Sequence, residues 1–278
     1  MKYQRPLQIA GGVIAILAGF LFLVVLFIPC DKVTEAVVQI MAQKGYEFRA
    51  ARCVKAFPIG ITSHKAEIAD QRGPLCQAER LTLRLKILPL LTGRVAVSLH
   101  AAIGKGELTG EWSQGRARVL SFSAKALPLE AVPLFRTVAK GEIKGELQMQ
   151  GSYREEKNAG SGELRLEVNK ADLRGIRIGE IPLPDAGFEK VQGMVRFQGG
   201  KGVVESLTFQ GDGLYMRLKG DVLPSTGEPT LALDLELMPK PEFLEQQRLV
   251  FALLTRYQTT PGHYLLPVRG TLSRPSIQ

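Results

Sequence analysis

TLALDLELM, from Thr230 to Met238, is the stretch that decides the predicted fold. Its apolar and polar residues alternate strictly, and leucines occupy every second position. Side chains of a β-strand point alternately to its two faces. The stretch therefore predicts a strand with one apolar face and one solvated face.

The same pattern recurs over most of the chain. The runs are RLTLRLKI (80–87), RVAVSL (94–99), GEIKGELQMQG (141–151), GELRLEVN (162–169), GMVRFQGG (193–200), VESLTFQGDGLYMRLKGDV (204–222) and LPVRGTL (266–272). Glycine-rich turns separate them, mostly at hairpin spacing. Residues 46–278 are therefore predicted to form a mainly β domain, a long antiparallel meander with few helices.

Adjacent strands in register place side chains of the same parity on one face of a sheet. We expect one apolar face to hold Leu147, Met149, Leu164, Leu166, Leu231, Leu233 and Leu235. Such a face must be buried, and two alternatives stay open. It closes into a packed core, or it remains an open groove that binds acyl chains.

Two amphipathic helices are predicted beside the strands. Residues 31–45 carry an apolar stripe and end at a glycine, which favours a helix packed at one end of the sheet; the stripe is Val33, Val37, Ile40 and Met41. Residues 241–258 begin with a proline suited to the first helical position. Their apolar face predicts a cover for part of the sheet, with a helix at a membrane surface as the alternative.

The segment from Leu7 to Ile28 has no charged residue, and as a helix it spans about 33 Å, enough to cross a bilayer core. We predict an uncleaved transmembrane anchor over 7–28. Residues 1–6, which include Lys2 and Arg5, are then cytoplasmic, and the chain from about Cys30 lies across the membrane. A cleaved signal peptide is disfavoured because no small-residue cleavage site follows. Lipidation at Cys30 is disfavoured by Pro29.

The net charge is +9, but basic residues alternate with acidic ones, as in Glu163-Leu-Arg165-Leu-Glu167. This pattern is typical of a solvated sheet face, so we expect no nucleic-acid partner. The three histidines are far apart in sequence, without partners at metal-ligand spacing. With no nucleophile elbow, Walker A loop or H-E-x-x-H motif, the sequence predicts no enzyme, no metal and no cofactor.

The cysteines are Cys30, Cys53 and Cys76, an odd and sparse set that does not form a disulfide framework. Two alternatives stay open for the last two. They form a Cys53–Cys76 disulfide in an oxidising compartment, or they are two inert strand thiols.

The order of elements resembles a known family. A short basic N-terminus, a span, an amphipathic helix, FPIGI (57–61) and LPLLTGR (88–94) together resemble the deltaproteobacterial type II secretion system protein N. ALPLEAVPLF (126–135) leading into GEIKGELQMQG, the paired strands of 193–238 and VRGTLSRPSI (268–277) are similar to the wider AsmA-like group. The resemblance implies a bacterial inner-membrane protein with a curved, β-rich periplasmic part and no catalytic residues.

Two functions follow as expectations. The first is a structural or assembly component of a type II protein secretion system, with other secretion-system or envelope proteins as partners. The second is an AsmA-like lipid-binding or lipid-transfer protein that holds acyl chains along the apolar face of its sheet. A face that closes favours the first function, and an open groove favours the second.

Overall fold

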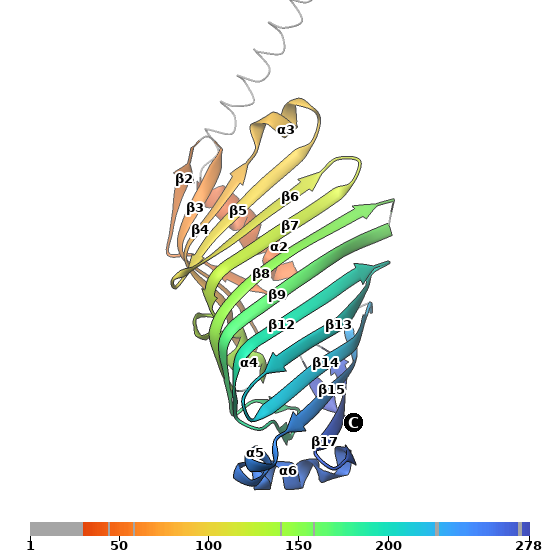
Figure 1. Ribbon diagram of the computed structural model, residues 1–278. Coiled ribbons are helices and arrows are strands. Elements are labelled where there is room, and N and C mark those ends of the chain that lie inside the picture. The colour runs from red at the N-terminus through yellow and green to blue at the C-terminus, as the bar shows by residue number, and fades with distance from the viewer. Residues whose placement is uncertain are drawn as a thin grey trace, which may run out of the picture.

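The computed structural model describes residues 30–43, 45–57, 59–139, 141–157, 159–225, 228–271 and 274–278. Its main feature is one 16-stranded antiparallel sheet that is twisted and bent (Figure 1). From β3 to β9 and from β12 to β15, each strand pairs with the next one in sequence. The predicted mainly β, antiparallel meander is therefore confirmed.

The strands are β1 (Glu47–Arg49), β2 (Arg52–Ala56), β3 (Gly60–Asp70), β4 (Gly73–Leu85), β5 (Val95–Ile103), β6 (Gly106–Gln114), β7 (Arg118–Pro128), β8 (Glu142–Glu156), β9 (Ala159–Arg174), β10 (Arg177–Ile178), β11 (Ile181–Pro182), β12 (Ala186–Gln198), β13 (Lys201–Gln210), β14 (Leu214–Leu223), β15 (Thr230–Pro239), β16 (Gln258–Thr260), β17 (His263–Thr271) and β18 (Pro275–Ile277). The helices are α2 (Cys30–Gln43), α3 (Ile87–Leu91), α4 (Leu134–Ala139), α5 (Pro241–Gln246) and α6 (Arg248–Leu254), and the 3₁₀ turns are η1 (Leu129–Ala131) and η2 (Thr255–Tyr257). β10 and β11 form a separate hairpin between β9 and β12.

Both edges of the sheet end in short strands. At one edge β1 and β2 both pair with β3, and at the other β16 and β18 both pair with β17. The long edge strands β3 and β17 are thereby covered for part of their length. Short edge strands limit uncontrolled pairing with other chains.

The predicted helices form with different bounds. The helix expected over 31–45 is α2, which contacts β1 and β2, and Gly45 follows it with a left-handed φ of +81°. Ile40, expected on the packed stripe, is exposed instead. The single helix expected over 241–258 is divided at Gln247 into α5 and α6, followed by η2.

The cysteine pairing is neither of the two alternatives left open for Cys53 and Cys76. Cys53 is bonded to Cys30, and Cys76 is a free thiol, so the Cys53–Cys76 disulfide does not form. The register shows why: Cys53 lies opposite Ser63, whereas Cys76 lies opposite Ile68, further along β3. Cys30 begins α2, which contacts β2, so the disulfide joins the first described residue to the edge of the sheet. Burial raises the pKa of the Cys76 thiol and makes it less reactive.

We predict that a thiol reagent applied to the unreduced, denatured protein labels Cys76 alone, because the other two sulfurs are bonded to each other. Mass spectrometry of labelled peptides measures this. The Cys76→Ser variant, the matched control, should take up no label until a reductant is added. Label on Cys30 or Cys53 before reduction would contradict the pairing.

Glu236 is a nearly buried carboxylate in β15. Its oxygens lie 2.6 Å from Lys219 Nζ and 3.5 Å from Arg217 Nε, both on β14. The hydrogen bond from Lys219 lowers the pKa of Glu236, and the nearby charges of Lys219 and Arg217 act in the same direction against the cost of burial. The folded state therefore favours the ionised form.

Because the folded pKa of Glu236 is lowered, its stabilising contribution is present above the ordinary glutamate pKa and is lost as pH falls through the folded value. We predict that Glu236→Gln lowers the melting temperature at neutral pH and that the difference from the parent narrows in acid. Melting curves over a pH series measure this. Glu163→Gln, which alters an exposed ion pair with Arg165, is the control and should change little.

Candidate functional site

The strand register defines one continuous apolar face. In β8 and β9, Met149 pairs with Leu166 and Leu147 with Val168. The same parity continues through β12, β13 and β14, where Leu218 meets Leu235 of β15. The seven residues expected on one face therefore lie on one face: Leu147, Met149, Leu164, Leu166, Leu231, Leu233 and Leu235.

The part of this face nearest the C-terminus is closed. Leu231, Leu233 and Leu235 are buried in a large cluster that extends from β9 to β18. Phe251 and Leu254 of α6 pack into the cluster, and Leu254 is fully buried. Figure 1 shows α5 and α6 at this end of the molecule. The amphipathic stretch 241–258 thus covers sheet, as its apolar stripe predicts.

The part of the face between β4 and β13 is open. Its large apolar side chains are half-buried or exposed, with Trp112 36% and Leu120 40% exposed. We call these residues the open apolar band: Leu83, Leu99, Leu108, Trp112, Leu120, Phe122, Met149, Tyr153, Leu164, Leu166, Val195, Phe197 and Leu207. The band crosses eight neighbouring strands, a width of about 34 Å at about 4.8 Å per strand.

Glycines within the strands let the larger side chains of the open apolar band lie flat against the sheet. A Cβ atom added at Gly151 would meet the ring of Phe122 on the neighbouring strand. In the same way, one added at Gly193 would meet Leu207 and Leu166. The larger side chains therefore lie over glycine backbone instead of standing upright. The sequence gives no direct signal for this arrangement, because glycine in an alternating run is equally compatible with a turn.

Only one side of the open apolar band is covered. The chain between β7 and β8 packs Ala131 and Val132 near Ala101, Ile103, Ala124 and Leu127. Thr137 of α4 also donates a 2.8 Å hydrogen bond to the carbonyl of Pro74, which fixes α4 against β4. These contacts bury the ends of β4 to β7 near α4. Towards the opposite ends of the same strands, at Trp112 and Leu120, the face is exposed.

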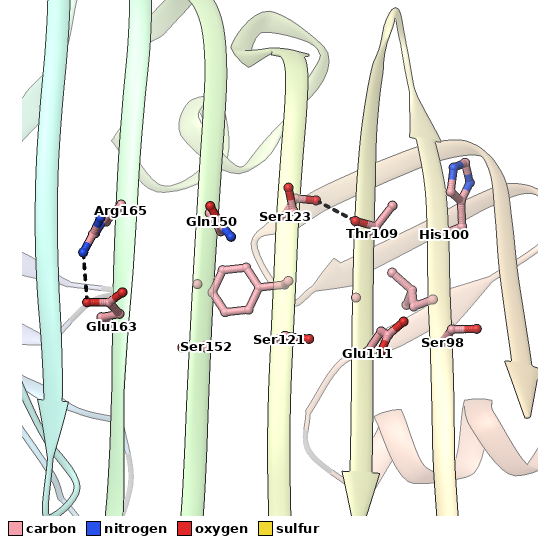
Figure 2. A pocket seen from close by; sticks show the side chains of 14 residues that line it. Ser98, His100, Thr109, Glu111, Ser121, Ser123, Gln150, Ser152, Glu163 and Arg165 are labelled. Atoms are coloured by element: carbon pink, nitrogen blue, oxygen red, sulfur yellow. Dashed lines mark hydrogen bonds and ion pairs between the residues drawn. The ribbon is translucent and has the colours of Figure 1, made fainter. Parts of the chain in front are cut away.

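The opposite, polar face of β5 to β9 contains a hollow of about 650 Å³. Figure 2 shows its side chains on five neighbouring strands; they include Ser98, His100, Thr109, Ser121, Ser123, Gln150, Ser152 and Arg165. Arg165 lies 3.4 Å from Glu163, and Thr109 donates a 3.4 Å hydrogen bond to the carbonyl of Ser123. His100 Nε2 lies 3.8 Å from Glu107 Oε2, and both side chains are about half exposed. Since these groups are solvated, the hollow is a weaker candidate than the open apolar band.

The described residues hold neither a cluster of metal ligands nor a membrane-spanning helix. Within the described part of the chain, no three residues among His, Cys, Asp and Glu come together as metal ligands would. In that same part, no helix has both the length and the apolar character to cross a membrane. The anchor predicted from Leu7 to Ile28 lies outside the described residues.

Comparison with known proteins gives no match: no family model, curated protein or solved structure matches this chain. The resemblance to the secretion-system family and to AsmA-like proteins therefore stays a prediction from sequence patterns.

The two parts of the apolar face predict different responses to a buried charge. Leu233→Asp places an unpaired carboxylate in the closed part, where Leu233 is 7% exposed, at a cost of several kcal/mol, about as much as a whole domain's stability. We expect no folded protein to accumulate. Leu166→Asp lies in the open apolar band, where water reaches the carboxylate, so a folded protein should accumulate.

Protease resistance and the melting curve of each variant measure this difference. Arg165→Asp, on the exposed polar face beside Leu166, is the control for the added charge. Equal loss of folded protein in Leu166→Asp and Leu233→Asp would show that the band is packed in solution, against the open face described above.

Proposed function

We propose that this protein binds lipid acyl chains along the open apolar band, as a membrane-anchored protein of the bacterial envelope. The observation that carries the proposal is the continuity of half-exposed apolar side chains across β4 to β13. A contiguous, solvent-exposed apolar surface of this extent marks a binding site for an apolar partner. The role is one of binding or transfer, without a catalytic step.

The dimensions of the band suit an acyl chain. A bilayer core of about 30 Å accommodates two acyl chains end to end, so the band, about 34 Å wide, is long enough for one chain or more. Each methylene removed from water contributes about 0.8 kcal/mol. A chain of a dozen methylenes therefore gains on the order of 10 kcal/mol before the cost of ordering it is subtracted.

Two observations support the proposed location on the periplasmic side of the inner membrane. The apolar segment from Leu7 to Ile28 follows Lys2 and Arg5, which favours a cytoplasmic N-terminus. The disulfide between Cys30 and Cys53 is of a kind that persists in oxidising compartments such as the periplasm. The assembly role in a type II secretion system rests on the resemblance alone and predicts a protein partner on the same band.

A photo-crosslinking amino acid in place of Leu166 tests the proposal in the full-length protein. After illumination of living cells, mass spectrometry of the purified chain should find an adduct of phospholipid mass at position 166, because the band holds acyl chains. The matched control carries the same amino acid in place of Arg165, one residue away on the opposite face, and should give no lipid adduct.

A second position guards against a local effect of the substitution. Leu99 lies on the same face in β5, and the crosslinker there should also capture lipid. If positions 166 and 99 both capture only protein, lipid binding is rejected and the assembly role is favoured.

A further inference from the structure

One end of the sheet combines exposed apolar side chains with positive charge. In an antiparallel meander alternate connections lie at the same end of the sheet. The turn after β2, the connection that holds α3 and the turn after β6 are such alternate connections. We call residues 55–57, 59–61, 86–95 and 115–118 the α3 rim, and Figure 1 shows α3 and β2 at the end opposite to α5 and α6.

The apolar side chains of the α3 rim extend into solvent. Phe57, in the turn after β2, is 82% exposed, and Leu88, in α3, is 78% exposed. Neither packs in the two core clusters of the described chain. Large apolar side chains at loop tips are costly in water and are favoured where they insert into a membrane surface.

The charge of the α3 rim has one sign. Its segments contain Lys55, Lys86, Arg94, Arg116 and Arg118 and no acidic residue. Lys86 pairs with Glu111 of β6, and Arg118 pairs with Glu155, the residue directly opposite it on β8. Cations at the tips of apolar loops suit the anionic head groups of a phospholipid membrane.

The N-terminal attachment places this end near the membrane. The predicted span ends at Ile28, two residues before Cys30, and Cys30 is bonded to Cys53 of β2. Phe57 follows Cys53 by four residues, about 13 Å along an extended strand. The anchor and the tip of the α3 rim are thus held close to each other by a covalent bond.

We propose that the α3 rim rests on the anionic lipid surface of the membrane that the chain is anchored in. Phe57 and Leu88 insert among the acyl chains near the head groups, and the rim cations contact the phosphates. The exposed side of the open apolar band, at Trp112 and Leu120, then faces the bilayer. In this part the inference rests on the proposed function: lipids enter the band from the membrane beside the rim.

The opposite end offers a matched control. Leu249 of α6 is 84% exposed, as apolar as Leu88 and equally accessible, but it lies at the far end of the molecule. The segment around Leu249 carries charges of both signs, with Glu242 and Glu245 beside Lys240, Arg248 and Arg256. If exposed apolar side chains alone determined membrane contact, Leu88 and Leu249 would both contact the membrane. If the α3 rim is the contact surface, only Leu88 does.

Tryptophan fluorescence in the full-length protein tests the proposal. In a Trp112→Phe background, which removes the single native tryptophan, Leu88→Trp and Leu249→Trp each provide one probe. The proteins are reconstituted in anionic phospholipid vesicles that contain a lipid with a nitroxide on its head group. We expect loss of fluorescence for the probe at position 88 and none for the probe at position 249.

The same measurement in a Leu166→Asp background distinguishes quenching by the membrane at the α3 rim from quenching by lipid bound on the open apolar band. Loss of fluorescence at position 88 should persist there, since the rim is unchanged. Its disappearance would assign the signal to band lipid and overturn the membrane contact while leaving the proposed function intact. No loss at position 88 in either background, or loss at 249 instead, would also overturn it. Loss at position 88 without a lipid adduct at position 166 would leave the rim contact standing and reject the proposed function.

Discussion

The structure depends on keeping one side-chain parity through the whole antiparallel ladder. A slip of a single residue would turn every apolar side chain of a strand to the polar face. The ladder is not perfectly regular, and its irregularities preserve the parity. Ala124 of β7 pairs with Met149, and Leu127, three residues later, pairs with Leu147, two residues away on β8. The additional residue places Ala124 and Leu127 on the same side of the sheet.

Two of these irregularities, in β7 and β9, contain a non-glycine residue with a left-handed backbone conformation. Ala126 has a φ of +49° and Lys170 a φ of +51°. In β9 the latter lies between Val168 and Ala171, both buried although they are three residues apart. Each such residue costs on the order of 1 kcal/mol, and the burial of the following apolar side chains offsets it. β-Bulges also bend strands and increase their twist, so the curvature of the sheet follows from the same residues.

The sequence predicts the class of fold because alternation is a local signal. The run 230–238 lies in β15, and residues 80–85 of the run 80–87 lie in β4, since their leucines recur at every second position; Ile87 instead begins α3. The bulges are not predictable, because Leu127 falls out of phase with Ala124 unless the position of the additional residue is known. Neither alternative weighed for Cys53 and Cys76 included the bond to Cys30, because spacing in sequence does not reveal that β2 and the start of α2 meet at one edge. The break at Gln247 is also invisible in the apolar stripe of residues 241–258.

The candidate site exists because one part of the sheet is covered and stabilises the fold while another part stays exposed. Closing an apolar face requires a cover, and the chain supplies it at the C-terminal end through α6 and at one side through α4. Between β4 and β13 the large apolar side chains of this face are half-buried or exposed, and glycines let them lie flat against the sheet. The closed part supplies the stability that a half-exposed apolar surface cannot supply for itself, because the ladder transmits it through continuous backbone hydrogen bonds. An open apolar face can then persist in a folded protein. Its apolar surface is not buried during folding and can instead be buried against a ligand.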